Sequence, residues 1–132
     1  MTADFSHGLA VFGIGIDLAE PSRLSQAALS PRFLQRVFSA EELRHFGGPP
    51  LEIIRLAEAF AFKEAFLKAL GTGWSEGIGF HEVIGPPVAD AGTLRLVGRA
   101  KLAAESRGIC TIQAGVQSAG DVSLAVVLLF SR

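Results

Sequence analysis

The sequence predicts one α+β domain in which a mostly antiparallel sheet packs on a single long helix. A strand-like apolar segment opens the chain, two more close it, and the longest helical segment lies between them. The order is strand, helices, strands, helix and strands without an internal repeat, which is typical of α+β folds rather than alternating α/β folds. We expect residues 1–132 to form one domain, with residues 1–8 as a loose N-terminal extension.

The first strand is predicted at Leu9–Asp17, where Gly13 and Gly15 interrupt the apolar side chains. Glycine inside a strand often marks a place where another backbone approaches closely. The strand ends in the carboxylate of Asp17, which suits a ligand-binding role. The ordinary alternative is that Asp17 caps the element that follows it.

The segment 21–46 is predicted to form helices with a local excess of basic side chains. These are Arg23, Arg32, Arg36, Arg44 and His45, against the acidic Glu41 and Glu42. The formal net charge of the whole chain is −1, which gives no general attraction for nucleic acid, so any electrostatic recognition must be local. The segment is either an ordinary solvated face or a surface that docks an acidic partner.

The longest helix is predicted at Pro50–Leu70, because this segment has no interior glycine or proline, and Gly71 ends it. Most of its surface is apolar, apart from one stripe. The residues of this stripe are Glu58, Ala61, Glu64, Ala65 and Lys68. The small alanines would let a ligand approach between Glu64 and Lys68. The alternative is a solvated i,i+4 ion pair that contributes about 0.2–0.5 kcal/mol.

The second half of the chain reads as strands around one short helix. Strands are predicted at Gly79–Ile84, Thr93–Val97, Ile109–Val116 and Val122–Phe130, and a helix at Arg99–Arg107. The single cysteine, Cys110, cannot form an internal disulfide, and we expect it to be a packed thiol.

The composition excludes several classes of protein. With 49% hydrophobic residues the chain can form a sizeable core, yet no apolar run approaches the roughly 18 residues that span a membrane. The N-terminal sequence MTADFSHG lacks the pattern of a signal peptide, so we expect a cytoplasmic protein without membrane or nucleic-acid partners. The zinc spacings HExxH and CxxC and the phosphate-loop pattern GxxxxGKS/T do not occur.

Two carboxylates are candidates for a metal site. Asp17 and Glu64 offer hard oxygen ligands, and magnesium is the natural occupant because it is usually held by one or two carboxylates, waters and substrate phosphates. Lys63 and Lys68 lie on either side of Glu64 in a helix that ends in Gly-Thr-Gly. This combination predicts chemistry on a metal-bound polyphosphate.

Three segments resemble, in the same order, the signatures of the holo-acyl-carrier-protein synthase family, the small 4′-phosphopantetheinyl transferases. They are GIGIDLAE (Gly13–Glu20), RVFSAEEL (Arg36–Leu43) and LAEAFAFKEAFLKALGTG (Leu56–Gly73). The likeness runs from Val11 to Ile84 and more weakly to Phe130. It implies the fold of these transferases and a homotrimer with the coenzyme A site at the subunit interface.

The resemblance also implies a reaction. A serine hydroxyl of an apo acyl carrier protein would attack the β-phosphate of coenzyme A, which transfers phosphopantetheine and releases 3′,5′-ADP. By the same resemblance Asp17 and Glu64 would bind Mg²⁺ on the pyrophosphate, and Glu64 would help to deprotonate the serine directly or through a water. Asp17, Glu64 and Lys68 are the implied catalytic residues.

The binding residues implied by the resemblance lie on both sides of this centre. The phosphates of coenzyme A would be held by Lys63, Lys68, Gly71, Thr72 and Gly73. Arg23 and Arg32 occupy places where arginines of the family meet the carrier protein, which would be of the fatty-acid or polyketide type.

The sequence departs from the family pattern at three places. Ala59 replaces a usual arginine, Asp90-Ala91-Gly92 replaces a Gly-Lys-Pro-like turn, and Gln113–Ser118 replaces a His-x-Ser-x-Ser/Thr-His segment. The residues that could compensate are Gln113, Ser118, Arg95 and Trp74. A second hypothesis therefore stays open: a catalytically weakened homologue that acts as a trimeric carrier-protein-binding or coenzyme-A-binding protein.

Overall fold

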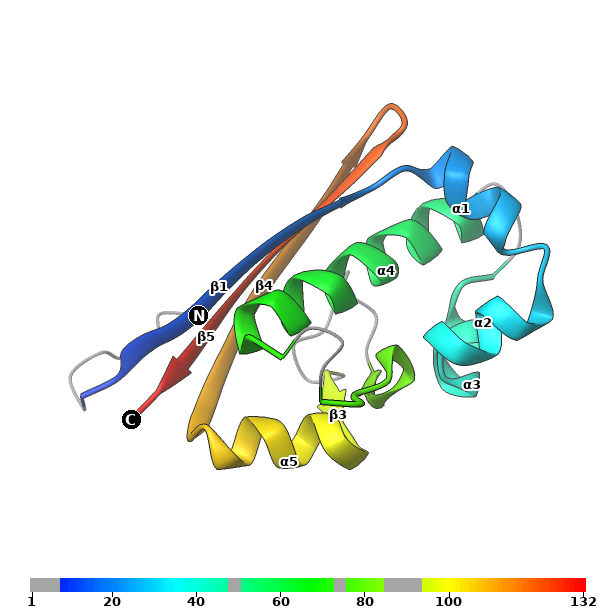
Figure 1. The fold of residues 1–132 in the computed structure, drawn as a ribbon. Coiled ribbons are helices and arrows are strands. Elements are labelled where there is room, and N and C mark those ends of the chain that lie inside the picture. Colours follow the sequence, from blue (N-terminus) through cyan, green and yellow to red (C-terminus); the bar gives the residue numbers. More distant parts are fainter. Residues whose placement is uncertain (1–7, 48–50, 73–75, 85–93) are drawn as a thin grey trace.

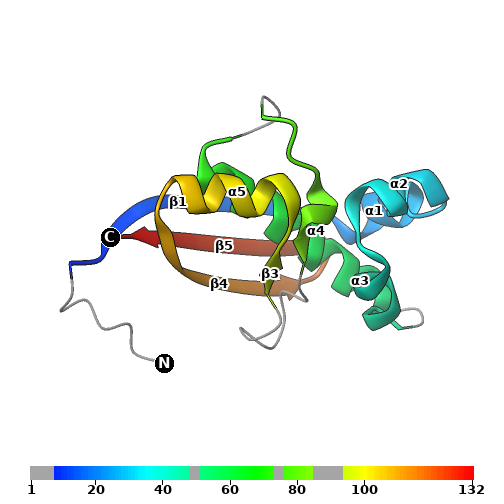
Figure 2. The ribbon, with the colours of Figure 1, turned by 90° about the horizontal axis from the view of Figure 1, so that it is seen from below.

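The computed structural model describes residues 8–47, 51–72, 76–84 and 94–132. Its main sheet is antiparallel and has the order β1 (Ala10–Ala19), β5 (Val122–Ser131), β4 (Ile109–Ala119). Helix α4 (Leu51–Leu70) lies along one face of this sheet (Figure 1), and Figure 2 shows the three strands side by side. The predicted architecture, an antiparallel sheet packed on one long helix, is confirmed.

Three short helices follow β1 at one end of the molecule (Figure 1): α1 (Pro21–Ala27), α2 (Pro31–Val37) and α3 (Ala40–His45). Proline opens α1 and α2, where its missing N–H costs no helical hydrogen bond. α3 begins with a capping box, because Ser39 and Glu42 each accept a hydrogen bond from the backbone N–H of the other. Local sequence signals therefore define this end of the molecule.

A small second sheet follows α4. The 3₁₀ turn η2 (Phe80–Glu82) leads into β2 (Val83–Ile84), which pairs with β3 (Arg95–Leu96), and α5 (Gly98–Ser106) then leads back to β4. The strand predicted at 79–84 is therefore wrong over most of its length. The carboxylate of Glu82 accepts hydrogen bonds from the backbone N–H groups of Gly79 and Ala100, which favours a turn there.

β1 is longer than predicted. Its pairing with β5 continues past Asp17 to the pairs Leu18 with Leu124 and Ala19 with Ser123. Asp17 consequently lies within the strand and not at its end. The predicted end of the long helix is confirmed, since Gly71 has a φ of +80°, a conformation that glycine adopts readily.

The two glycines of β1 let the strand lie directly against α4. A Cβ on Gly15 would lie 1.8 Å from the carbonyl oxygen of Ala65, and one on Gly13 would lie 1.9 Å from that of Ala69. The expected close backbone approach is thus confirmed. The expected low surface for a ligand is wrong, because Ala61 and Ala65 are fully buried under the sheet.

The opposite face of the main sheet is apolar and exposed. Ile14, Ile16 and Leu18 of β1 are each more than half exposed, and no helix of the described residues covers them (Figures 1 and 2). Cys110, on the edge strand β4, is exposed, so the expected packed thiol is wrong. No helix within the described ranges is both long and apolar enough to cross a membrane.

Candidate functional site

The contact between β1 and α4 brings Asp17 and Lys68 together. The Nζ atom of Lys68 lies 2.6 Å from Oδ1 of Asp17 and 3.3 Å from the carbonyl oxygen of Ile16. Glu64 lies one turn before Lys68 on the same helix. Asp17, which lies 47 positions or more before the other two residues, therefore forms one cluster with the carboxylate of Glu64 and the ammonium group of Lys68.

The charges of this cluster act on one another. Burial raises the pKa of Glu64 above its ordinary value, the nearby charge of Asp17 raises it further, and Lys68 opposes both effects. The hydrogen bond to Asp17 is the largest cause that raises the pKa of Lys68, which keeps this lysine protonated. The like charges of Asp17 and Glu64 are thus only partly compensated.

This donor set fits a magnesium ion. Within the described residues no group of three or more metal-ligating side chains occurs, which excludes a closed protein cage there. Magnesium commonly uses one or two carboxylates and completes its shell with waters and substrate phosphates. The negative charge of Asp17 and Glu64 that Lys68 leaves uncompensated would favour such a cation.

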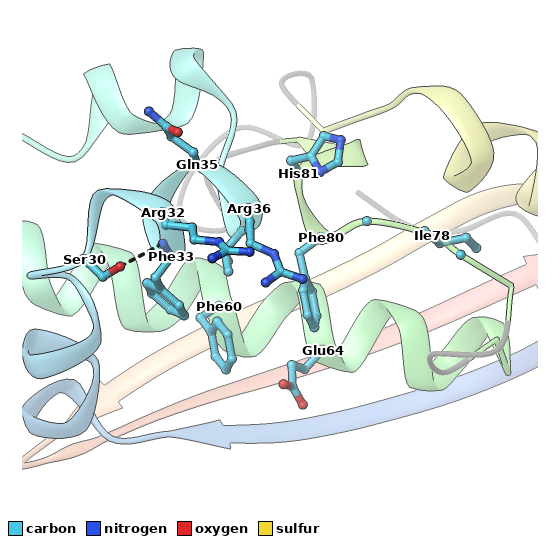
Figure 3. Close-up of a pocket in the computed structure, with 13 residues that line it drawn as sticks. Ser30, Arg32, Phe33, Gln35, Arg36, Phe60, Glu64, Ile78, Phe80 and His81 are labelled. Atoms are coloured by element: carbon cyan, nitrogen blue, oxygen red, sulfur yellow. Dashed lines mark hydrogen bonds between the residues drawn. The ribbon is translucent and has the colours of Figure 1, made fainter.

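A groove of about 980 Å³ opens beside Glu64 (Figure 3). α2 forms one side, residues 77–81 form the other, and Phe60 and Glu64 of α4 form the floor. The residues of the two sides are Ser30, Arg32, Phe33, Gln35, Arg36, Val37, Gly77, Ile78, Gly79, Phe80 and His81.

Aromatic rings cross this groove from side to side. The ring centroids of Phe33 and Phe60 are 6.3 Å apart, and those of Phe60 and Phe80 are 5.8 Å apart. Arg32 and Arg36 add two positive charges one turn apart on α2, and Figure 3 shows Arg36 extending toward Phe80. The groove therefore combines an apolar floor, a basic side and one carboxylate.

The family model of the 4′-phosphopantetheinyl transferase superfamily matches residues 13–127 of the chain. The chain belongs to this family. The holo-[acyl-carrier-protein] synthase of Solidesulfovibrio magneticus is 37% identical over 120 residues, which cover 89% of this chain and 96% of that protein.

Solved structures support the same assignment. Holo-[acyl-carrier-protein] synthase from Neisseria meningitidis has a TM-score of 0.75 at 30% identity and covers 91% of this chain and 98% of its own. The enzyme from Bacillus anthracis, solved in complex with CoA (3′,5′-ADP), has a TM-score of 0.68 at 25% identity, with 92% of this chain and 98% of its own covered.

Lys63, expected from the family resemblance to bind a phosphate, lies apart from Lys68. Its side chain is fully buried, and its ammonium group donates to Oε1 of Glu42 at 2.8 Å, to the carbonyl oxygen of Phe80 at 2.9 Å and to that of Val83. Burial lowers the pKa of Lys63, and the charge of Glu42 opposes this shift. The side chain of Lys68, by contrast, is 54% exposed.

The turn that follows α4 is described as far as Thr72. The backbone N–H groups of Gly71 and Thr72 both donate to the carbonyl oxygen of Leu67, at 3.0 and 3.4 Å, and Thr72 is 2% exposed. Gly73, the last residue expected to hold the cofactor phosphates, lies outside the described residues. The turn directly follows the helix that carries Lys68.

The two arginines expected to meet the carrier protein are both exposed. Arg23 lies on α1, where its guanidinium is 4.0 Å from Glu20, and Arg32 lies on α2 at the groove. α1 is tied to the turn between β4 and β5, because Ser22 donates from its backbone N–H and its hydroxyl to the two carboxylate oxygens of Asp121. This contact holds Arg23 in a fixed relation to the main sheet.

Two of the residues that could compensate for the departures from the family pattern, Ser118 and Arg95, have protein partners here. Ser118 donates to Oε1 of Glu58 at 2.7 Å and lies 2.7 Å from the hydroxyl of Ser123, so it is directed into the protein. Ala59 is fully buried, and Arg95 pairs with Glu41 at 2.7 Å. Gln113 is half-buried on β4, while Trp74 and residues 90–92 lie outside the described residues.

The contacts of two further glutamates in this region were not predicted from the sequence. Glu42 pairs with Lys63, and Glu58 binds Ser118, 60 positions away. A signal existed for Glu42, because Ser39 and Glu42 have the spacing of a capping box. Nothing in the spacing of Glu58 and Ser118 indicates their contact.

Proposed function

We infer that this chain is a holo-[acyl-carrier-protein] synthase, which transfers 4′-phosphopantetheine from coenzyme A to a serine of an apo acyl carrier protein. Membership of the transferase family, together with the intact cluster of Asp17, Glu64 and Lys68, supports this function most strongly. The carrier would be of the fatty-acid or polyketide type. We assign the enzyme to the cytoplasm, as expected from the sequence.

Each residue of the cluster receives a role in this reaction. Glu64, whose pKa burial and Asp17 raise in the metal-free protein, accepts the proton of the attacking serine directly or through a water. Lys68 neutralises charge on the pyrophosphate as the bond between phosphorus and the 3′,5′-ADP oxygen breaks. Asp17 orients Lys68 through their ion pair.

Asp17 and Glu64 would hold the magnesium ion, which when bound supplies charge neutralisation for the two phosphates of coenzyme A. Gly71, Thr72 and Gly73 are the remaining proposed phosphate contacts. They follow Lys68 directly in the chain. The transition state of such a transfer requires mainly positioning and charge stabilisation, which these groups can provide.

We propose that the basic side of the groove, together with Arg23 of α1, docks the acidic carrier protein. Replacing Arg32 with glutamate should raise the KM for the carrier about tenfold and leave the Kd for coenzyme A unchanged, since a reversed charge at an interface rim mainly slows association. Steady-state kinetics with calorimetric titration of coenzyme A measures both. Arg44→Glu is the matched control, an exposed arginine of α3 outside the groove. A normal carrier KM in Arg32→Glu would contradict this docking site.

The homotrimer of the family resemblance is also part of the proposed function. The exposed face formed by Ile14, Ile16 and Leu18, with Val126 and Leu128 paired beside them on β5, is a contiguous apolar surface of the kind that subunits bury. Ile16→Lys should convert a trimer to monomers, because a buried lysine without a partner opposes association. Light scattering after size exclusion measures this mass.

The control for this assembly test is Leu102→Lys. Leu102 is equally apolar and is 64% exposed, but it lies on α5. It should leave the trimer intact. A wild-type monomer, or a trimer that survives Ile16→Lys, would exclude this face as the subunit contact.

A weakened homologue that only binds coenzyme A or the carrier is the second candidate. The inward direction of Ser118 favours it, since this hydroxyl is engaged by Glu58 and Ser123. Release of 3′,5′-ADP separates the two candidates. An active enzyme should release it only with coenzyme A, magnesium and an apo carrier that retains its serine, whereas a binding protein should bind coenzyme A with measurable affinity and release none.

A further inference from the structure

Lys63 is the lysine of α4 to which the proposed reaction assigns no role. All three hydrogens of its ammonium group have protein acceptors, namely Oε1 of Glu42 and the carbonyl oxygens of Phe80 and Val83. The side chain has no exposed surface. A lysine saturated in this way has no free donor for a phosphate.

The acceptors of Lys63 come from different parts of the fold. Glu42 lies on α3, Phe80 on η2 and Val83 on β2, and the ring of Phe38, just after α2, lies 5.5 Å from the ammonium nitrogen. One side chain of α4 thus connects α4 to three other elements. Phe80 belongs to the 77–81 side of the groove, which we call the far wall.

The far wall lies next to the proposed reaction centre. Glu64 follows Lys63 directly on α4 and forms part of the groove floor, and Figure 3 shows Phe80 extending toward α4 above Glu64. Lys63 donates to the backbone carbonyl of Phe80, the residue whose ring lies over this floor.

We propose that Lys63 is a positioning residue whose buried ion pair with Glu42 fixes the far wall of the groove beside Glu64, and that it does not touch coenzyme A. This inference rests on the proposed transferase function. It replaces the phosphate-binding role that the family resemblance implies for Lys63. To reach a phosphate, Lys63 would have to leave a buried carboxylate unpaired, which is strongly unfavourable.

Glu42 provides a specific test because its charge can be removed while its hydrogen bond in the capping box of α3 is kept. Glu42→Gln keeps an oxygen for the backbone N–H of Ser39, removes the charge and replaces the second oxygen with an NH₂ group of similar size. Removing one member of a buried ion pair destabilises a protein, whereas removing both charges is often close to neutral. The four proteins of the cycle are the wild type, Lys63→Met, Glu42→Gln and the double variant.

The experiment measures melting temperature, the Kd for coenzyme A by calorimetry, and kcat and KM for transfer to an apo carrier. We expect Lys63→Met to lower kcat about 100-fold and Glu42→Gln about tenfold, with the double variant recovering at least tenfold over Lys63→Met. The Kd for coenzyme A should stay within about threefold of wild type in every variant that folds. A loss of folded protein would lower the calorimetric stoichiometry for coenzyme A in proportion to kcat, so the positioning role also requires a wild-type stoichiometry in each variant.

A phosphate ligand would behave differently. Lys63→Met and the double variant would then both bind coenzyme A at least tenfold more weakly, without recovery, and Glu42→Gln would transfer normally. That result overturns the inference. If Lys63→Met does not fold, Glu42→Gln and the double variant still separate the two roles through the same Kd and kcat.

The two proposals can fail separately. Coenzyme A binding without any transfer by the wild type would refute the transferase function, and the Kd of the variants would still decide whether Lys63 contacts the cofactor. A wild type that neither binds coenzyme A nor transfers would overturn both. Normal transfer by the wild type with weakened coenzyme A binding in the double variant would overturn the positioning role alone.

Discussion

Glu64→Gln should lower the rate of phosphopantetheine transfer by about 10²–10⁴-fold while the protein stays folded. The amide cannot accept the proton of the attacking serine and is a poorer magnesium ligand than a carboxylate. The variant keeps the shape of the side chain, so the floor of the groove should not change. The rate is measured by 3′,5′-ADP release under saturating carrier and coenzyme A.

The same substitution should not destabilise the metal-free protein. The folded-state pKa of Glu64 is raised, so the ionised side chain opposes folding above that pKa. The Glu64→Gln variant should therefore melt at or above the wild-type temperature near neutral pH. The difference in melting temperature between the variant and the wild type should disappear as the pH falls through the pKa of Glu64, where the wild-type carboxyl becomes neutral. Differential scanning calorimetry in chelator at several pH values measures it.

Glu58→Gln is the matched control for this prediction. Glu58 is a buried carboxylate of α4, whereas Glu64 is half-buried, and Gln at position 58 can still accept the hydrogen bond of Ser118. Its transfer rate should remain within about threefold of wild type. Near-normal transfer by Glu64→Gln, with magnesium dependence retained, would refute both roles of Glu64.

Gly15→Ala should largely abolish folding or activity. The added Cβ would lie 1.8 Å from the carbonyl oxygen of Ala65 and 2.9 Å from the backbone nitrogen of Ala69, and neither backbone atom can move without shifting α4. β1 would have to separate from the helix, which also separates Asp17 from Lys68. Overpacking typically costs about 1–3 kcal/mol, and a clash with backbone should reach or exceed the upper end. Chemical denaturation measures the change.

Gly115→Ala serves as its control, because a Cβ on this strand glycine of β4 meets nothing within 4 Å. It should change the free energy of unfolding by less than about 0.5 kcal/mol, as for an open surface position. Gly115 pairs with Val126 of the exposed apolar face, through which we propose that subunits associate. Both variants are therefore compared at the same protein concentration. Equal stability of the two variants would contradict the close contact between β1 and α4.

The sequence predicted the features that depend on local signals. Gly13 and Gly15 indicated a close backbone approach, Gly71 indicated the end of the long helix, and the carboxylates of Asp17 and Glu64 were candidates for one metal site. Each of these properties follows from residue type and periodicity. They were sufficient to predict the fold class and the candidate site.

The remaining features depend on tertiary contacts that no local pattern records. Lys63 and Lys68 are both lysines of α4. The side chain of Lys63 is buried against Glu42, however, whereas that of Lys68 is exposed beside Asp17. A strand was predicted at Gly79–Ile84, but Phe80–Glu82 form a 3₁₀ turn, whose Glu82 carboxylate accepts a hydrogen bond from the backbone N–H of the distant Ala100. These contacts join residues far apart in the sequence, so they can be identified only from the folded structure.

The intact mass of an apo acyl carrier protein, recorded before and after incubation with this protein, coenzyme A and magnesium, tests the central claim most directly. A transferase should add about 340 Da to the carrier, the increment of phosphopantetheine in this chemistry, and chelation of the metal should prevent the gain. A panel of carriers of the fatty-acid and polyketide types would also identify the partner. An unchanged mass for every carrier, while coenzyme A binds normally, would contradict the transferase function and leave the weakened homologue.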